Sequence, residues 1–463
     1  MESDSLSPPA LVFLAVALLL VFTVPRDKVI FPVLVSTVLM TIGQSINILG
    51  ANFYFLRIVI IAAWLRLMMR GQLRRPLVLH PIDKAFILYV AYAVLMGFVP
   101  KHTDPRAVMP PMTLMQTIIN KGGVTLDSLG AYFLARQLFR SMKDVMFTIR
   151  VLIIICIVLA CFMTVEKTTG RNLFSAFGVV PEYTVVRDGH LRCQGPFTHP
   201  IHAGDYGATL MVLCAGLWLY GQKSVAFVGF AAAAIVTVES SSSGPLLSSI
   251  YGLGSFLIWP FRFRMHVIRR SLVLLILILH VTMTSPVWWA ISRVAEFTGG
   301  GGYWRSKLID EFVEHTSEWF WTGSLYTAHW SPTGSGLPMY PDHMDLTNQY
   351  VAEGVHGGIG QIILYILIVV RCFTRIGLGI RSLSPGDKME RFYWALGCCL
   401  VAYLASFLSV AGSMQSDILY FTFLAFIATI PLPEPNPTQP AASADSKEPR
   451  LLAREPGGVA QSL

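Results

Sequence analysis

The chain has 463 residues, of which 54% are hydrophobic and only 13% are charged, and its mean hydropathy is +0.58. Soluble domains carry roughly 25% charged residues, so this composition excludes an ordinary soluble protein. The net charge of +8 comes largely from short segments between apolar runs, where Lys and Arg mark the cytoplasmic side of a membrane protein. We therefore attribute it to topology and to contact with anionic lipid, and we expect no nucleic acid partner.

Apolar runs recur along almost the whole chain, and a run of about 20 residues is enough to span the hydrocarbon core of a bilayer. We expect an all-α polytopic membrane protein with about 12 to 13 transmembrane helices and a large, partly helical outer loop between the late helices. The expected spans are 9–25, 29–50, 52–69, 83–99, 124–140, 146–165, 206–221, 224–239, 245–260, 271–292, 353–371, 392–411 and 417–432.

Two long polar stretches, 166–205 and 293–352, interrupt this pattern. The Lys and Arg bias of the short loops places both stretches and the N-terminus outside, and the C-terminus inside. We divide the chain into N-terminal helices over 1–165, a region over 166–432 that contains both outer loops, and a disordered cytoplasmic tail over 433–463. The seven cysteines lie mostly in or beside spans, so no disulfide framework is expected.

The first outer loop ends in a segment rich in Arg and His, with Arg187, His190, Arg192, His199 and His202 close together just before a span. Arginine carries a planar fork of donors that matches phosphate oxygens. This segment therefore suits a phosphate or pyrophosphate attached to a lipid. The alternative is that the arginines only anchor the loop to lipid headgroups.

The serine-rich run VESSSSGPLLSSIYG over 238–252 lies where one expected span ends and the next begins. Serine hydroxyls cap free backbone N–H groups at a helix start, and a helix start also attracts anions. Capping alone explains the serines equally well. Glu239 is more informative, because a carboxylate at the end of a spanning helix needs a partner or a function.

The second outer loop is rich in aromatic residues, which form an interfacial belt, the core of a small subdomain or a surface for sugar rings. It also holds many Asp, Glu and His residues as candidate proton acceptors, among them His315, His329, His343 and Asp345. The sequence Asp342-His343-x-Asp345 is only a weak metal-binding pattern. We therefore expect no metal and no other cofactor.

Four segments in order resemble the O-antigen ligase and O-antigen polymerase superfamily of bacterial inner-membrane proteins. RCQGPFTHPIHAG over 192–204 is similar to the family's Arg-x-x-Gly-x-Phe-x-x-Pro block, and SSSGPLL over 241–247 to its Ser-rich block. YWRSKLIDEF over 303–312 has the Arg that opens the large loop, and DLTNQYVAEGVHGGIG over 345–360 resembles the block that closes it. The resemblance covers roughly 150–430 and implies a periplasmic location for both outer loops.

The resemblance implies glycan transfer from an undecaprenyl-pyrophosphate-linked donor to an acceptor glycan or to lipid A-core, without a nucleotide sugar or a metal. Arg192 and Arg305 would hold the pyrophosphate, and Arg187, His199 and Asn348 are further candidate substrate-binding residues. Such proteins work in the inner membrane in exopolysaccharide or lipopolysaccharide synthesis, so membrane lipid and chain-length or export proteins are the expected partners.

One departure concerns the catalytic base. Many ligases of this family have a His directly before the Asn of the closing block, whereas this chain has Thr347 before Asn348. His343 and Asp345 are therefore the expected base or base-orienting residues, with Glu239 as a further catalytic candidate. The departure favours a polymerase slightly over a ligase.

Two other functions stay open. A transporter or flippase for lipid-linked glycan needs charged residues along a path through the membrane, and Arg57, Arg66, Asp127, Arg136 and His280 are the candidates. A non-catalytic subunit of an export complex is the third reading.

Overall fold

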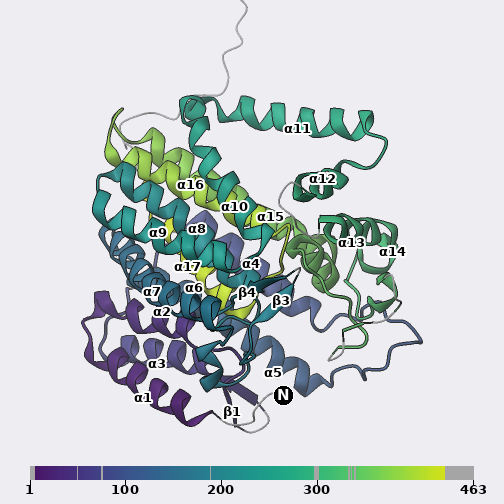
Figure 1. Ribbon diagram of the computed structural model, residues 1–463, viewed down its shortest axis with the longest axis horizontal. Helices are drawn as coiled ribbons and strands as arrows, with labels where there is room; N and C mark the ends of the chain where they lie inside the picture. Colours follow the sequence, from purple (N-terminus) through teal and green to yellow (C-terminus); the bar gives the residue numbers. More distant parts are fainter. Residues whose placement is uncertain are drawn as a thin grey trace, which may run out of the picture. The chain divides into compact units, whose positions relative to one another are not determined.

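The structure is a computed structural model, and it describes residues 6–48, 51–74, 77–187, 189–296, 302–331, 334, 336–337 and 340–432. Met1–Ile430 form one compact unit and Pro431–Leu463 a second one. The expected tail over 433–463 lies outside the described residues. Helices dominate the described residues and strands are confined to two short hairpins, as expected for an all-α fold (Figure 1).

The first part of the chain forms short helices rather than a series of full-length spans. Their bounds are α1 (Pro8–Thr23), α2 (Ile30–Leu39), α3 (Phe55–Met69), α4 (Pro81–Met96), α5 (Leu114–Thr125) and α6 (Ala131–Leu138). The expected span over 29–50 is wrong, because α2 ends at Leu39 and the chain then forms the hairpin of β1 (Ser45–Ile48) and β2 (Ala51–Tyr54). Gly43, with a φ of +98°, lies in the turn between α2 and β1.

A helical bundle forms the middle of the unit. It consists of α7 (Met142–Thr169), α8 (Pro200–Tyr220), α9 (Lys223–Glu239), α10 (Ser243–Gly254) and α16 (Lys388–Ser406), of which α8 contacts α9, α10 and α16 extensively (Figure 1). Small residues allow these close contacts. A Cβ placed on Gly216 of α8 would lie 2.4 Å from the Cβ of Ala395 on α16.

A 3-10 segment (Ser255–Arg264) follows α10 and leads into α11 (Met265–Thr282). In Figure 1, α11 runs along the top of the view, apart from the bundle. None of its residues is buried, although most are Leu, Ile or Val. Such a surface is unfavourable in water and favourable in lipid.

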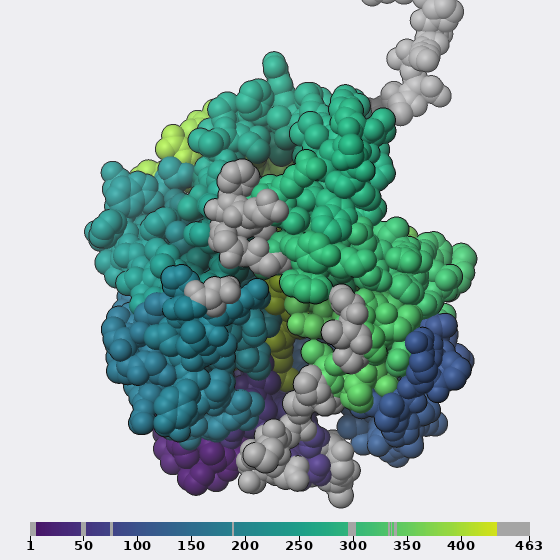
Figure 2. Space-filling view, turned by 45° about the vertical axis from the view of Figure 1, so that its right-hand side comes forward, coloured from purple at the N-terminus to yellow at the C-terminus, as the bar shows by residue number. Residues whose placement is uncertain are grey.

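The second outer loop folds around a small core of its own. The chain forms α12 (Ala290–Glu296), α13 (Gly302–Glu314) and α14 (Thr316–Trp319), and Leu308, Trp319 and Trp330 pack with the start of α15. Trp330 is 1% exposed, whereas Trp321 is 75% exposed. The aromatic residues of this loop are therefore divided between a core and an open surface. In Figure 2 the green atoms of this part of the chain lie beside the blue segment that follows α4.

The last helices are α15 (Gln349–Arg381), α16 and α17 (Met414–Ala428). Helix α15 is broken at Gly357 and Gly358, which has a φ of +70°. The second outer loop closes this break, because the backbone N–H of Ile359 donates to the carbonyl of Phe320 over 2.8 Å. The hydroxyl of Tyr92 on α4 donates to the carbonyl of Gly357 over 3.2 Å. These two backbone groups at the break thus have partners.

Three helical segments are long and apolar enough to cross a membrane among the residues that the structure describes. They are Met142–Thr169, Ser243–Thr282 and Gln349–Arg381.

Candidate functional site

The Arg-rich end of the first outer loop forms a hairpin of β3 (Val185–Arg187) and β4 (His190–Arg192). The carboxylate of Glu166, near the end of α7, fixes the chain beyond the hairpin by accepting from the backbone N–H groups of Gln194 and Gly195. The ammonium of Lys167 donates to the carbonyl of Leu191 over 2.6 Å. The hairpin is thereby attached to the end of a long helix.

The serine-rich run forms the turn between α9 and the start of α10. Ser241 has a φ of +45°, a conformation that costs a non-glycine residue energy and persists only where its surroundings hold it. The guanidinium of Arg192 donates to the hydroxyl of Ser242 over 2.9 Å. The hairpin arginine and the start of α10 therefore face the same space.

The second outer loop supplies Arg305 on α13. Its side chain is buried, and Asp205 on α8 interacts with it electrostatically. Burial lowers the pKa of Arg305, but a guanidinium stays protonated at physiological pH. A Cβ placed on Gly244 of α10 would lie 3.4 Å from the guanidinium, so the backbone of α10 approaches this arginine closely.

These segments enclose a cavity of about 520 Å³, which is in the range of ligand sites. Three parts of the chain that are far apart in the sequence line the cavity. They are the β3–β4 hairpin with the start of α8, the turn between α9 and α10, and the segment from α13 to the start of α15. Five residues proposed from the sequence line it, namely Arg187, Arg192, His199, Arg305 and Asp345.

The cavity is strongly cationic, and Asp345 is the one carboxylate among its described lining residues. Burial, together with the positive charges of Arg192 and Arg187, lowers the pKa of His199 to about 4, so its imidazole is neutral at pH 7. Its Nδ1 accepts from the backbone N–H of Ile201 over 3.2 Å, which leaves the proton on Nε2. Burial raises the pKa of the Asp345 carboxyl above its ordinary value. A carboxylate of raised pKa is a better proton acceptor near neutral pH.

The other three proposed residues do not line the cavity, within the part of the chain that the structure describes. Glu239 accepts from the hydroxyl of Thr164 over 2.9 Å. His343 lies in a turn closed by its own backbone, and burial lowers its pKa. Asn348 caps α15 by accepting from the N–H of Tyr350 over 2.9 Å. This cap fixes the chain just after the cavity-lining Asp345.

The sequence reasoning missed several cavity residues. Trp304 and Thr347 are next in sequence to Arg305 and Asn348, which the resemblance had identified. Their positions beside these residues could have indicated them as cavity residues. Ser409 follows α16 and lies in no motif, and only the fold brings it to the cavity. Asp342, the first residue of the weak metal pattern, instead accepts from the backbone N–H groups of Val108 and Met109.

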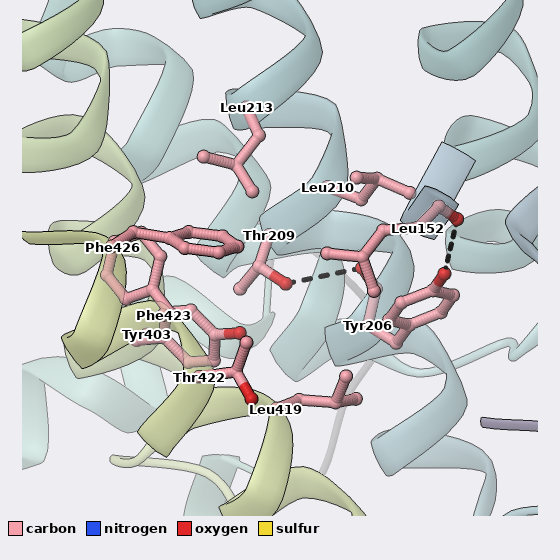
Figure 3. Close-up of a pocket in the computed structure, with 10 residues that line it drawn as sticks. All are labelled: Leu152, Tyr206, Thr209, Leu210, Leu213, Tyr403, Leu419, Thr422, Phe423 and Phe426. Atoms are coloured by element: carbon pink, nitrogen blue, oxygen red, sulfur yellow. Dashed lines mark hydrogen bonds between the residues drawn. The ribbon is translucent and has the colours of Figure 1, made fainter. Parts of the chain in front are cut away.

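A second, much smaller cavity of about 20 Å³ lies inside the bundle (Figure 3). Its walls are mostly apolar, and the hydroxyl of Tyr206 beside it is satisfied by the carbonyl of Leu152 over 2.6 Å. A space of this size holds about one water molecule. We therefore place the candidate site in the larger cavity alone. No protein family model and no curated protein matches the chain.

Proposed function

We propose that the chain is a multi-pass protein of the bacterial inner membrane, with fewer membrane-crossing segments than the 13 runs expected from the sequence, because the run over 29–50 is not one. The apolar and fully unburied surface of α11 supports this proposal. By the Lys and Arg bias, the N-terminus and the cavity are periplasmic and the C-terminus is cytoplasmic.

We further propose that the protein transfers or polymerises glycan from an undecaprenyl-pyrophosphate-linked donor in surface or exopolysaccharide synthesis. The observation that carries the proposal is the meeting of Arg187, Arg192 and Arg305 with the start of α10 around one cavity that also contains the Asp345 carboxylate. Arginines and a helix start both favour phosphate oxygens, and the carboxylate supplies a proton acceptor.

In the proposed reaction the arginines bind the pyrophosphate and neutralise the charge that develops as it leaves. Asp345 accepts the proton of the acceptor hydroxyl, whose oxygen forms a bond to the anomeric carbon. The bond from that carbon to the pyrophosphate oxygen breaks, and the electron pair leaves with the lipid pyrophosphate. The neutral His199 is a hydrogen-bond donor in this arrangement. By the family resemblance, configuration at the anomeric carbon inverts and no metal takes part in the transfer.

Asp345 is preferred to the other two candidate bases because it alone of the three lines the cavity. The resemblance to the ligase and polymerase superfamily leaves the acceptor open. The replacement of the family's His by Thr347 favours a polymerase slightly over an O-antigen ligase.

The test is reconstitution of the purified protein with lipid-pyrophosphate-linked repeat units, with products separated by size. A ladder of longer lipid-linked glycans is the expected result for a polymerase. Transfer only after addition of lipid A-core would identify a ligase. No transfer under either condition would refute the enzymatic proposal and favour transport or a non-catalytic export subunit.

A transporter or flippase is the second candidate, and the break in α15 is the observation in its favour, because discontinuous helices are typical of transport sites. Three of the five candidate residues for a transport path, Arg57, Asp127 and Arg136, are held in ion pairs, however. Arg57 pairs with Asp127 at 2.8 Å, and Arg136 pairs with Asp83 at 2.9 Å. Such pairs stabilise helix contacts without forming a path. We therefore place transport second.

A further inference from the structure

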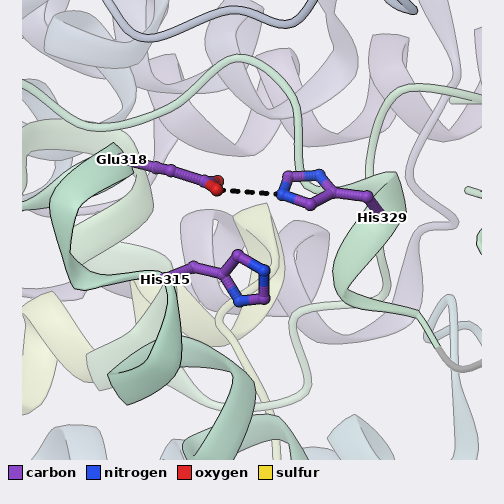
Figure 4. A group of neighbouring side chains, drawn as sticks. All are labelled: His315, Glu318 and His329. Carbon is purple, nitrogen blue, oxygen red and sulfur yellow. Dashed lines mark hydrogen bonds and ion pairs between the residues drawn. The ribbon is translucent and has the colours of Figure 1, made fainter.

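A cluster of His315, Glu318 and His329 lies in the second outer loop, outside the lining of the large cavity (Figure 4). His315 precedes α14, Glu318 lies on α14, and His329 lies in the short helix Ala328–Trp330. One ligand atom from each residue lies within 4.8 Å of the other two. His329 Nε2 lies 3.0 Å from Glu318 Oε1, and in Figure 4 the two side chains face each other above His315.

The surroundings prepare two of these side chains to bind a cation. His315 Nδ1 lies 2.9 Å from the backbone carbonyl of Glu311. A carbonyl only accepts, so Nδ1 carries the proton and Nε2 keeps its lone pair. The indole N–H of Trp330 donates to Glu318 Oε2 over 3.0 Å, which leaves Oε1 on the side of His329. Metal-binding histidines and carboxylates are typically oriented by such outer partners.

The third side chain is held by packing. The ring of His329 stacks on Tyr326 with an interplanar angle of 10°, and its side chain is 15% exposed. Its Nδ1 is buried and has no hydrogen-bond partner within the described part of the chain. A neutral His329 with its proton moved to Nδ1 would direct a free Nε2 lone pair at the same point as Glu318 Oε1.

His102 is the candidate for a fourth ligand, and it comes from a distant part of the sequence. His102 Nε2 lies 4.0 Å from Glu318 Oε2, in the segment between α4 and α5. Backbone hydrogen bonds hold this segment against the loop: His102 N–H donates to Gly323, and Leu325 N–H donates to the His102 carbonyl over 2.8 Å. The four side chains therefore come from two segments that are already fixed to each other.

We propose that His315, Glu318 and His329, with His102 as the fourth ligand, bind one Zn²⁺ ion that fastens the segment after α4 to the second outer loop. Imidazole nitrogen and carboxylate oxygen are ordinary zinc ligands, at about 2.0–2.2 Å in a tetrahedral arrangement. Side-chain rotation has to bring the ligand atoms of His315, Glu318 and His329, which now lie within 4.8 Å of one another, onto one ion. The site is structural and does not depend on the proposed glycan transfer, because none of its residues lines the large cavity.

The test uses the full-length protein in detergent, with any affinity tag removed, stripped with a chelator and titrated with ZnCl₂ against a chromogenic zinc chelator. We expect about one zinc ion per chain, with affinity lowered at least about tenfold in Glu318→Gln, His329→Ala and His102→Ala. Glu318→Gln keeps both the side-chain size and an oxygen for the Trp330 hydrogen bond, so it tests the charge without unfolding the loop. His266→Ala, at an exposed histidine of α11, is the matched control and should bind zinc normally.

X-ray absorption of the zinc-loaded protein gives a readout that a loss of folding cannot imitate. We expect nitrogen and oxygen neighbours alone, at about 2.0 Å. Sulfur neighbours at about 2.3 Å would place the zinc on cysteines and overturn the proposal. Less than stoichiometric binding, or equal affinity in wild type and Glu318→Gln, would also overturn it. Because these readouts measure metal and not glycan transfer, their failure would leave the proposed function untouched.

Discussion

Arg192 and Arg305 are the residues on which the proposed pyrophosphate site depends most. Arg→Lys at either position keeps the charge but loses the planar fork of donors. A hydrogen bond to a charged group contributes about 1.5–3 kcal/mol, so we expect turnover to fall roughly 10- to 100-fold. Initial rates of glycan transfer with the lipid-linked donor measure the effect.

The control is Arg171→Lys, at an exposed arginine of the first outer loop, which also carries Arg192. This variant should keep the wild-type rate. Full activity in both cavity variants would remove the arginines from the mechanism and return them to an anchoring role.

Asp345 gives a prediction about pH. Burial raises the pKa of its carboxyl, and a protonated carboxyl cannot accept the hydroxyl proton. Activity should therefore rise with pH through a step that lies above the ordinary carboxyl value of about 3.9. The pH profile of kcat/KM in wild type measures this step, and Asp345→Asn should abolish turnover while donor binding persists.

His343→Ala separates the two candidate bases. This variant should retain the rising step, because His343 does not line the cavity. Loss of turnover in His343→Ala together with normal turnover in Asp345→Asn would reverse the assignment.

At the residue scale, the sequence grouped residues that the fold brings together, but it did not assign their roles. The three arginines proposed from the sequence all line the cavity; Arg192 and Arg305 are buried there, whereas Arg187 is exposed. The sequence did not separate the roles of the acidic and histidine residues of the second outer loop, because residues close together in sequence there have different surroundings in the fold. Asp345 lines the cavity, whereas Asp342 binds backbone N–H groups and His315 joins a separate cluster.

At the scale of the elements, the start of α10 packs closely beside the cavity. A Cβ on Gly244 would lie 2.9 Å from the Cβ of Ser409, so Gly244→Ala should push the start of α10 away from Arg305. Overpacking of this kind costs about 1–3 kcal/mol, and we expect a lower Tm in detergent together with weaker donor binding. Gly254→Ala, at the other end of α10, meets nothing within 4 Å and should leave both quantities unchanged.

The boundaries of elements were harder to predict than their type. The run over 29–50 is apolar enough for a span, but an apolar composition does not distinguish a helix from a strand. Gly43, with its positive φ, lies in the turn between the helical part of this run and the first strand. The sequence left three interpretations of the aromatic residues in the second outer loop: an interfacial belt, a subdomain core or a surface for sugar rings. It could not choose between them, because the burial of a side chain depends on partners far away in the sequence. Trp330 belongs to a core that includes the start of α15, which no local pattern indicates.

For the whole molecule, the surface of α11 gives a test of the membrane proposal. Leu275 is 51% exposed in the middle of this helix. If α11 lies in lipid, Leu275→Lys costs about 2.5–3.5 kcal/mol of insertion free energy and reduces the fraction of protein that stays in membranes after carbonate extraction. Leu275→Phe, which remains apolar, is the control. Equal membrane retention of both variants would place α11 in water.

The break in α15 also decides how this molecule can be cut and recombined. The carbonyl of Phe320 occupies the gap at Ile359, and a Cβ on Gly358 would lie 2.5 Å from the carbonyl of Trp321. The second outer loop is therefore not an interchangeable module that can be exchanged between proteins. A chimera would need to carry the loop and the first half of α15 together, since a foreign loop would leave the backbone N–H of Ile359 without its partner.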